Sequence, residues 1–340
     1  MSGLDADALV AGMKAHVSFL KRAHRAGVSL REPTASALLR YKLWLRLVCE
    51  DSEATVPALD GAWRWHCHRL APAAYARAGR EIGAEGPVDR PAEAFKAQED
   101  EGDEGAATRD AWRRRYADVP FFGGGDAHEA DTVVSGFDLA ACAARQATFL
   151  WQVSGQSFSD DAFLKAGVGA YEKYLGLMRA HPGEFLVPTY QIDLVWHTHI
   201  LVDAAAYARE SKELAGRVVD HDDSVNDRSS PETKLNRSTA TTKRLWAARY
   251  GESFDVPGGM YRGEPPADFF RPTHFLSNGE LVLSGGGAPI AADANGGNVE
   301  LAKVSETRTH VYGVALSARE PLSLFIPAST KRGAYNARKG

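Results

Sequence analysis

The stretch that decides the fold occurs twice in this 340-residue chain. Residues 187–209 read VPTYQIDLVWHTHILVDAAAYAR, and residues 56–77 read VPALDGAWRWHCHRLAPAAYAR. Both copies keep Val-Pro, a Trp-His-x-His tetrapeptide and Ala-Tyr-Ala-Arg in the same order, and the spacing slips by one residue only before the tyrosine. Two copies of a rare tetrapeptide with matching flanks indicate an internal duplication. We therefore expect two related helices in similar surroundings.

The second copy has apolar residues on nearly every side, which is typical of a helix that is buried all round. On such a helix His197 and His199 point about 200° apart, so this pair cannot hold one ion from the same face. Asp193 and His197, four residues apart, do share a face and can form an acid–imidazole pair. The first copy has Ala62 at the position of Asp193. Any chemistry is therefore expected to be asymmetric.

Helical spacing continues through most of the first 266 residues. Leu9, Met13, Val17 and Leu20 recur at three- and four-residue steps in a helix predicted over about 4–25, and Thr34 to Val48 repeats the pattern. Further helical patterns cover 63–80, 108–116, 137–153, 160–180, 190–212 and 238–250. The polar residues 220–242 predict a long loop, and the acidic run Glu99 to Glu104 predicts a solvated one. The sequence thus predicts a mainly α fold, an all-helical domain over 1–266.

The composition changes after Pro265-Pro266. Short β-prone segments at 281–283, 311–314 and 322–326 are separated by turns that contain glycine or proline. We expect a small β-rich C-terminal segment over 267–340. The glycines at 285–287 lack a Walker lysine and no helical pattern follows them, so they predict a turn and not a phosphate-binding loop.

Charge and hydropathy exclude several classes of protein. Lysine and arginine number 40 against 44 acids, and no block of basic residues occurs, so nucleic acid is not the expected partner. No run approaches the roughly 20 apolar residues of a membrane span, and the first residues are acidic where a secretory signal is basic. The three cysteines, Cys49, Cys67 and Cys142, form neither a disulfide framework nor a zinc ribbon. We expect a cytoplasmic protein without membrane contact.

Three interpretations of the histidines stay open. They can be buried structural groups whose ring N–H atoms bond to backbone carbonyls. They can form a metal site across the two copies, because two imidazoles and a carboxylate with open positions are typical of iron or zinc chemistry. They can also serve acid–base catalysis without a metal. The metal-site candidates are His66, His68, Asp193, His197, His199, His221 and Asp222.

These motifs resemble the glycine-rich domain-containing protein-like family of plants and fungi. The resemblance rests on Val56 to Pro72, on Phe185 to His199, and on the later motifs at 219–223 and 260–263, and it covers about residues 4–266. One departure is Gln191, where the family usually has an acid. The resemblance implies a role in development and in the stress response, without an established reaction. Some plant members carry an RNA-recognition module, but this chain shows no aromatic RNA-binding strand.

The expected function is that of a cytoplasmic regulatory or interaction protein with an unidentified protein partner and no required cofactor. The alternative is a metal-dependent hydrolase or oxygenase that holds zinc, iron or manganese in a His/Asp site built across the duplicated helices. A helical domain that binds a small molecule or a lipid is a third interpretation. Whether the chain is an enzyme stays open from the sequence.

Overall fold

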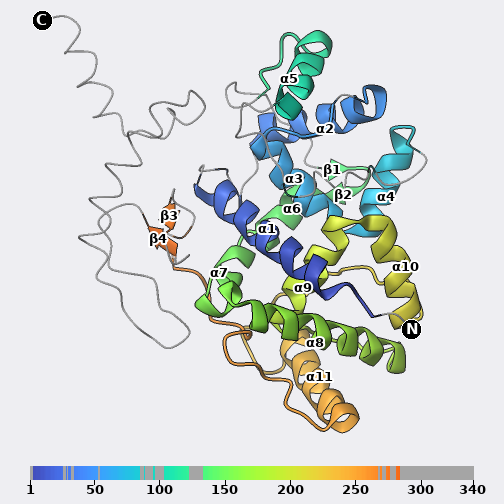
Figure 1. The fold of residues 1–340 in the computed structure, drawn as a ribbon, viewed down its shortest axis with the longest axis vertical. Helices are drawn as coiled ribbons and strands as arrows, with labels where there is room; N and C mark the ends of the chain where they lie inside the picture. Colours follow the sequence, from blue (N-terminus) through green and yellow to red (C-terminus); the bar gives the residue numbers. More distant parts are fainter. Residues whose placement is uncertain are drawn as a thin grey trace, which may run out of the picture.

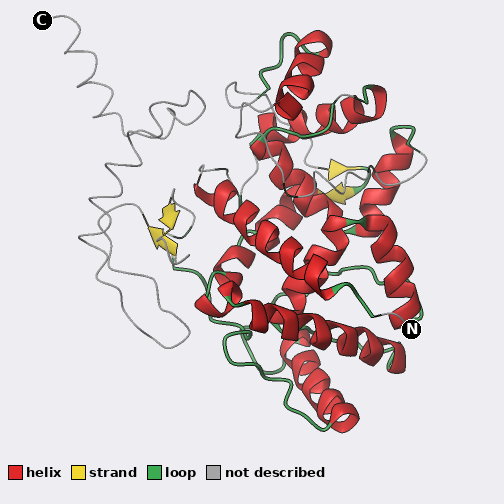
Figure 2. Ribbon diagram, in the orientation of Figure 1, coloured by secondary structure: helices red, strands yellow, loops and turns green. Residues whose placement is uncertain are grey.

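The arrangement of the chain comes from a computed structural model. It describes residues 3–25, 28, 30–31, 34–52, 54–84, 88, 95, 103–121, 133–266, 269, 273–275 and 281–283. Figure 2 shows that these residues form helices, with two short antiparallel hairpins. The prediction of a mainly α fold is confirmed. None of the described helices is long and apolar enough to cross a membrane.

The elements follow the chain in the order shown in Figure 1. The helices are α1 (Ala6–Arg25), α2 (Ala35–Glu50), α3 (Leu59–Arg69), α4 (Pro72–Glu81), α5 (Asp103–Arg115), α6 (Leu139–Gln146), α7 (Phe149–Val153), α8 (Asp161–Ala180), α9 (Tyr190–Val202), α10 (Ala204–Ala215) and α11 (Lys234–Tyr250), with a 3₁₀ turn at Gln156–Ser159. The strands are β1 (Val133–Val134), β2 (Phe137–Asp138), β3 (Thr273–Phe275) and β4 (Leu281–Leu283).

The C-terminal prediction falls mostly on residues that the structure does not describe. Within 267–340 the described strands β3 and β4 pair antiparallel, with Thr273 opposite Leu283. The β-prone segments at 311–314 and 322–326 lie outside the described residues, as do residues 99–102 of the acidic run. The boundary after residue 266 stays a prediction.

Helix α1 lies in the middle of the molecule, between two groups of helices (Figure 1). It packs against α8 and α9 and also touches α3. The predicted apolar stripe, which includes Leu9, Met13 and Val17, is buried in these contacts. His16 lies on the same buried side and has no exposed surface. Helix α1 therefore brings a polar ring into the centre of the core.

The predicted helix over 137–153 begins with β2 and breaks between α6 and α7, and two further predicted helices are each divided in two. The pattern over 63–80 breaks between α3 and α4, where Pro72 begins α4 because proline fits the first turn of a helix. The pattern over 190–212 breaks at Asp203, whose side chain accepts a hydrogen bond from the backbone N–H of Ala206 at 2.7 Å and so caps α10. Apolar spacing continues across both breaks, which hides them from the sequence.

The predicted loop over 220–242 is too long. Its second half belongs to α11, which Thr233 caps by accepting a hydrogen bond from the backbone N–H of Asn236 at 3.4 Å. The first two turns of α11 are largely polar, so they carry no apolar stripe that spacing can detect.

The duplication extends over four helices. Helices α2 to α5 correspond in order to α8 to α11, and equivalent side-chain bonds recur in both groups. In each copy the tryptophan of the Trp-His-x-His motif donates a hydrogen bond to the tyrosine of the Ala-Tyr-Ala-Arg motif. That tyrosine donates in turn to a backbone carbonyl in the following loop. These relays are Trp65–Tyr75–Val88 in the first copy and Trp196–Tyr207–Val219 in the second.

The last helix of each copy repeats the same contacts. The hydroxyl of Thr108 on α5 accepts the backbone N–H of Val56 at 3.3 Å, and that of Thr242 on α11 accepts the backbone N–H of Val187 at 3.0 Å. A tryptophan packs edge-on against a tyrosine and a phenylalanine in each. These sets are Trp112, Tyr116 and Phe121 in the first copy and Trp246, Tyr250 and Phe254 in the second. The sequence repeat is thus the centre of a longer structural one.

Candidate metal centre

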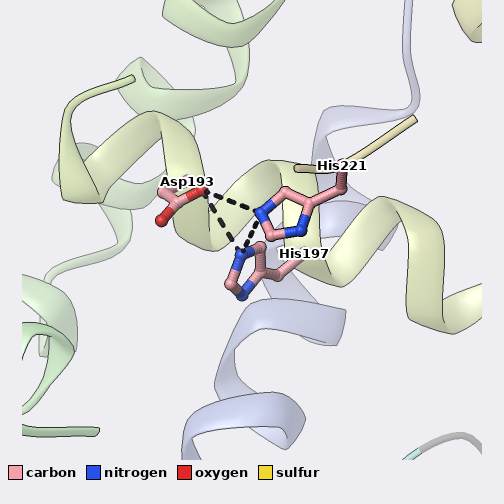
Figure 3. Close-up of side chains that lie close together, drawn as sticks. All are labelled: Asp193, His197 and His221. Carbon is pink, nitrogen blue, oxygen red and sulfur yellow. Dashed lines mark hydrogen bonds and ion pairs between the residues drawn. The ribbon is translucent and has the colours of Figure 1, made fainter. Parts of the chain in front are cut away.

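Three of the candidate side chains converge on one point (Figure 3). Asp193 and His197 come from α9, and His221 comes from the loop between α10 and α11. The two Nε2 atoms lie 2.9 Å apart, and the Asp193 Oδ1 lies 3.4 Å from His197 Nε2 and 3.9 Å from His221 Nε2. Among the residues that the structure describes, no other set of three His, Cys, Asp or Glu side chains brings its ligand atoms so close.

The triangle of ligand atoms has the size that one transition-metal ion requires. The point that is equally far from the three ligand atoms lies about 2.0 Å from each of them, as their three mutual distances require. Zinc lies about 2.0–2.1 Å from histidine nitrogens and about 2.0–2.2 Å from carboxylate oxygens. An ion near the plane of the three atoms therefore meets all of them without movement of the backbone.

Helix α9 places two of the ligands by simple spacing. Thr189 caps the helix by accepting the backbone N–H of Ile192 at 3.1 Å, so regular geometry begins before the first ligand. Asp193 and His197 then follow one turn apart and share a face, as the sequence predicted. The His197 side chain is 1% exposed and that of Asp193 is 17% exposed. The carboxylate therefore lies nearer to solvent.

The loop that carries His221 reaches across to the first copy. Asp220 accepts the backbone N–H of Ala73, at the start of α4, at 3.3 Å. The carbonyl of Leu70, at the end of α3, lies beside the His221 ring and acts to raise its pKa. Because Nε2 faces the other two side chains, this carbonyl favours the tautomer with the proton on Nδ1 and the Nε2 lone pair free, as in many metal-bound histidines.

A second set of hydrogen bonds holds the loop just after His221. The Asp223 carboxylate accepts a bond from Arg145 Nε at 2.9 Å and one from Gln146 Nε2 at 2.9 Å, both from the end of α6. The thiol of Cys142 on the same helix lies 3.7 Å from Asp223 Oδ2. The loop is thus tied to α4 on one side of His221 and to α6 on the other, which fixes the imidazole in place.

Burial and the neighbouring charges act in opposite directions on the pKa of each of the three groups. Burial lowers the pKa of His197 to about 3 although the Asp193 carboxylate raises it, so this ring is neutral. Burial also acts to lower the pKa of His221, but its bond to Asp193 and the charges of Asp193 and Asp223 leave that pKa raised. Burial raises the pKa of Asp193, but the two histidines leave it lowered. A metal ion and a proton would therefore compete for the same atoms, the two Nε2 nitrogens and the Asp193 carboxylate.

His66 does not join this centre. Its Nε2 lies 2.8 Å from Nε2 of His16, whose Nδ1 lies 3.1 Å from the hydroxyl of Thr198. The His66 ring stacks on Trp63 with the ring centroids 5.0 Å apart. His66 therefore belongs to a closed chain of hydrogen bonds that joins α1, α3 and α9. The sequence reasoning missed His16, for which the only signal was a histidine within an apolar stripe.

His68 and His199 occupy equivalent positions and have equivalent partners. His68 Nδ1 lies 2.8 Å from the hydroxyl of Tyr41, and His199 Nδ1 lies 3.3 Å from the hydroxyl of Tyr171. His199 Nε2 also lies 3.1 Å from a carboxylate oxygen of Glu210. Both rings hold the second helix of a copy against its first helix. The structure thus places them apart from the three converging ligands.

Asp222, the last candidate, points elsewhere as well. Its carboxylate accepts the backbone N–H of Ser224 at 2.9 Å and stabilises a turn at the surface. The structure therefore brings together three of the seven candidates, Asp193, His197 and His221, and does not bring His66, His68, His199 or Asp222 to them.

A groove of about 540 Å³ lies beside the three ligands, all of which contribute to its wall. The rest of the wall comes from α6 and α7, the segment that precedes α9, the loop over 217–228, and residues 261 and 264. Phe149 packs on His197 with the ring centroids 4.3 Å apart and closes one side of the centre. The groove therefore opens onto the three converging side chains.

Comparison with known proteins confirms the family resemblance. Residues 87–209 match the family described as glycine-rich domain-containing protein-like. Glycine-rich domain-containing protein 2 of Arabidopsis thaliana is 32% identical over 283 residues, which are 76% of this chain and 35% of that protein. Glycine-rich domain-containing protein 1 of the same plant is 30% identical over 285 residues, 76% of this chain and 34% of that protein.

The chain spans about a third of the length of the curated relatives that it matches. No solved structure matches it. The matched segment 87–209 includes Asp193 and His197 but ends before His221. One residue of the candidate centre, His221, thus lies outside the segment that the family model matches.

Proposed function

The chain contains a domain of the glycine-rich domain-containing protein-like family, and we propose that this domain binds one divalent transition-metal ion through Asp193, His197 and His221. The observation that carries the proposal is the convergence of their three ligand atoms on a point about 2.0 Å from each. One carboxylate and two imidazoles suit zinc, iron or manganese better than calcium or magnesium, which prefer all-oxygen sites.

The chain's own groups support this proposal beyond the distances. The Leu70 carbonyl beside His221 favours the tautomer with a free Nε2, and the buried face of α9 orients the His197 ring. The Nδ1 atom of His197 is buried and has no hydrogen-bond partner among the described residues, so this ring interacts through Nε2 alone. Both imidazoles thus direct Nε2 toward Asp193.

The proposed activity is that of a metal-dependent enzyme, with a hydrolase and an oxygenase both compatible with the donor set. A bound metal would supply a Lewis acid and an activated water or oxygen-binding position. The chain's residues would fix the ion with three ligands, hold them by the loop bonds at Asp220 and Asp223, and leave the groove side open for a substrate.

Metal content by plasma mass spectrometry tests the proposal, on tag-free protein prepared without chelator and then loaded with each metal. We expect about one ion per chain in the wild type, and loss of that ion in His197→Gln and His221→Gln. His199→Gln and Asp222→Asn are matched controls, since each changes a similar group next to a ligand. A wild type that stays empty after loading contradicts the proposal, and so does equal loss in the controls.

A regulatory or interaction role in the cytoplasm, linked to development or the stress response, is the second candidate function. It is supported by the buried histidines at 66, 68 and 199, whose bonds to other protein groups favour a scaffold role. Under this role, Asp193, His197 and His221 bind no metal ion and a protein partner occupies the groove. Cross-linking with Arg217→Gln and Glu184→Gln groove variants tests it, because a partner in the groove should lose its cross-links in these variants.

A further inference from the structure

We propose that Arg228 anchors the negatively charged end of a small organic anion in the groove, with the other end of that molecule at the Asp193, His197 and His221 centre. The metal-facing half of this inference rests on the proposed function. The part at Arg228 rests on three separate observations. An aromatic wall leads to Arg228, its guanidinium forms no ion pair with a carboxylate of the described residues, and most acids around it are bonded to other groups.

A row of rings leads from the centre to Arg228. Phe149 packs on His197 with centroids 4.3 Å apart, and Tyr190 follows at 6.2 Å from Phe149. Tyr261 then stacks near Tyr190 at 6.2 Å. All four rings line the same groove. Their faces and edges form a continuous apolar wall that suits a hydrocarbon or aromatic body.

Arg228 is fixed at the far end of this wall. Its guanidinium carbon lies 4.2 Å from the centroid of the Tyr261 ring, which is a cation–π contact. Burial raises the pKa of Tyr190 to about 12, and the charge of Arg228 nearby acts against this rise. Two aromatic residues therefore border the guanidinium, and most of its five N–H donors remain for another group.

No carboxylate in the described part of the chain forms an ion pair with Arg228. Five of the six acids that line the groove have other partners, and the sixth, Glu184, forms no ion pair with Arg228 among the described residues. Asp193 faces the histidines, Asp220 accepts Ala73 N–H, Asp222 accepts Ser224 N–H, Asp223 accepts Arg145 and Gln146, and Glu264 accepts the Tyr261 hydroxyl. The acid-rich wall therefore leaves the Arg228 charge available to an anion from outside.

The size of the groove sets the class of occupant. A volume of about 540 Å³ falls within the roughly 300–1,000 Å³ of small-molecule sites. A guanidinium binds planar carboxylate or phosphate groups through two parallel hydrogen bonds. The occupant that fits is thus a small molecule with an apolar body, an oxygen donor at the metal end, and a carboxylate or phosphate at the other end.

The test uses the monohydroxamates of linear dicarboxylic acids, from succinic to sebacic, as probes. Their hydroxamate can bind a metal and their carboxylate can reach Arg228, while the length series allows for the span between the two. Alkyl hydroxamates of equal length lack the carboxylate. Binding is measured by calorimetry on zinc-loaded wild type, on Arg228→Gln, and on Arg217→Gln as the matched control in the same groove wall.

We expect one length in the series to bind about tenfold or more tightly than its carboxylate-free partner in the wild type. Arg228→Gln should remove that preference, and Arg217→Gln should keep it. The inference is overturned if no member of the series shows the preference, or if Arg217→Gln removes it equally.

The same titration on metal-free protein separates the two proposals. If zinc does not bind but the carboxylate probes still bind more weakly to Arg228→Gln than to wild type, the metal proposal fails and the anchor is supported. If zinc binds at one ion per chain and the carboxylate gives no advantage, the anchor is overturned and the metal proposal stands.

Discussion

His66 and His197 occupy equivalent places in the two copies, yet they face different partners. His197 lies one turn after Asp193 and meets His221 at 2.9 Å. His66 lies one turn after Ala62 and meets His16 of α1 at 2.8 Å. The same helix with the same histidine thus takes part in a buried hydrogen-bond chain in one copy and lines a groove beside Asp193 and His221 in the other.

The difference comes from two additions to the second copy. One is the carboxylate of Asp193, and the other is the loop that carries His221 back to the end of α3. Helix α1 adds a further asymmetry, because its His16 bonds to the motif histidine His66 in the first copy but to Thr198, and not to His197, in the second. The two copies of the scaffold therefore differ in the polar groups that meet at the same helix position.

A second contrast concerns what joins the first two helices of each copy. Arg40 on α2 forms a buried ion pair with Asp60 on α3, with its Nε 3.1 Å from the carboxylate. The equivalent residues in the second copy are Ala170 and Gln191. Gln191 donates instead to the carbonyl of Phe163 at 2.7 Å. The first copy depends on a buried charge pair that the second copy does without.

The largest expected effect comes from replacing the Arg40–Asp60 pair with the residues found in the second copy. Asp60→Gln alone leaves the buried Arg40 guanidinium without its carboxylate and should lower the free energy of unfolding by about 3–5 kcal/mol. The double variant Arg40→Ala and Asp60→Gln, which copies the second set, should recover most of this loss. Urea unfolding measures both. A double variant no more stable than Asp60→Gln would break the equivalence of the two copies.

The next effect is a dependence on pH. Burial and the charge of Arg77 lower the pKa of His68 to about 3, whereas an unfolded histidine has a pKa near 6.5. The unfolded chain then binds the proton first, so stability should fall as the pH drops from about 6.5 toward 3, by up to ~1.4 kcal/mol per pH unit. His68→Phe should flatten this slope in urea unfolding at a series of pH values.

His199→Phe sharpens that comparison. The Glu210 carboxylate beside His199 opposes the burial that lowers its pKa, so this ring should contribute less to the slope than His68 does. An equal flattening by the two variants would mean that the carboxylate does not distinguish the copies.

A smaller effect should appear equally in both copies. Tyr75→Phe removes the hydroxyl between Trp65 and the Val88 carbonyl, and Tyr207→Phe removes its equivalent. Each leaves a buried donor and a buried acceptor unpaired, which costs about 1–3 kcal/mol of unfolding free energy. Thermal and urea unfolding should give similar losses, and a neutral result for one of them would show that the relays are not equivalent.

The smallest effect concerns the loop that holds His221. Asp223→Asn weakens the bonds to Arg145 and Gln146 without removing a ligand, and should reduce zinc affinity about tenfold. Asp222→Asn, one residue away and bonded only to a surface turn, should leave the affinity unchanged. Competition with a chromophoric chelator measures both, and equal affinities would show that the α6 contact does not position the ligand.

The sequence predicts the helices well and their ends poorly. Apolar spacing marks α1, α2 and α8 because each buries a stripe, but it runs unbroken through Asp203 and past Leu70, where a cap and a proline start new helices. The early part of α11 has no stripe to find. The two copied motifs predict the duplication, but its full extent depends on single residues such as Thr108 and Thr242, which only contacts reveal.

The candidate site could be predicted in part. Asp193 and His197 follow from their four-residue spacing on a helix. His221 could be named as a candidate but not placed, since its position depends on a loop that docks on Leu70 and Ala73 of the other copy. His66 looks equivalent to His197 in the sequence, and only the packing of α1 shows that its Nε2 is already occupied.

The most direct test of this account compares zinc affinity in His197→Gln and His66→Gln, the same change at equivalent places, alongside the wild type and with folding checked by circular dichroism. The account predicts one tight site in the wild type and in His66→Gln, and a loss of about a hundredfold or more in His197→Gln. Equal affinities in the two folded variants, or no site in the wild type, would contradict it.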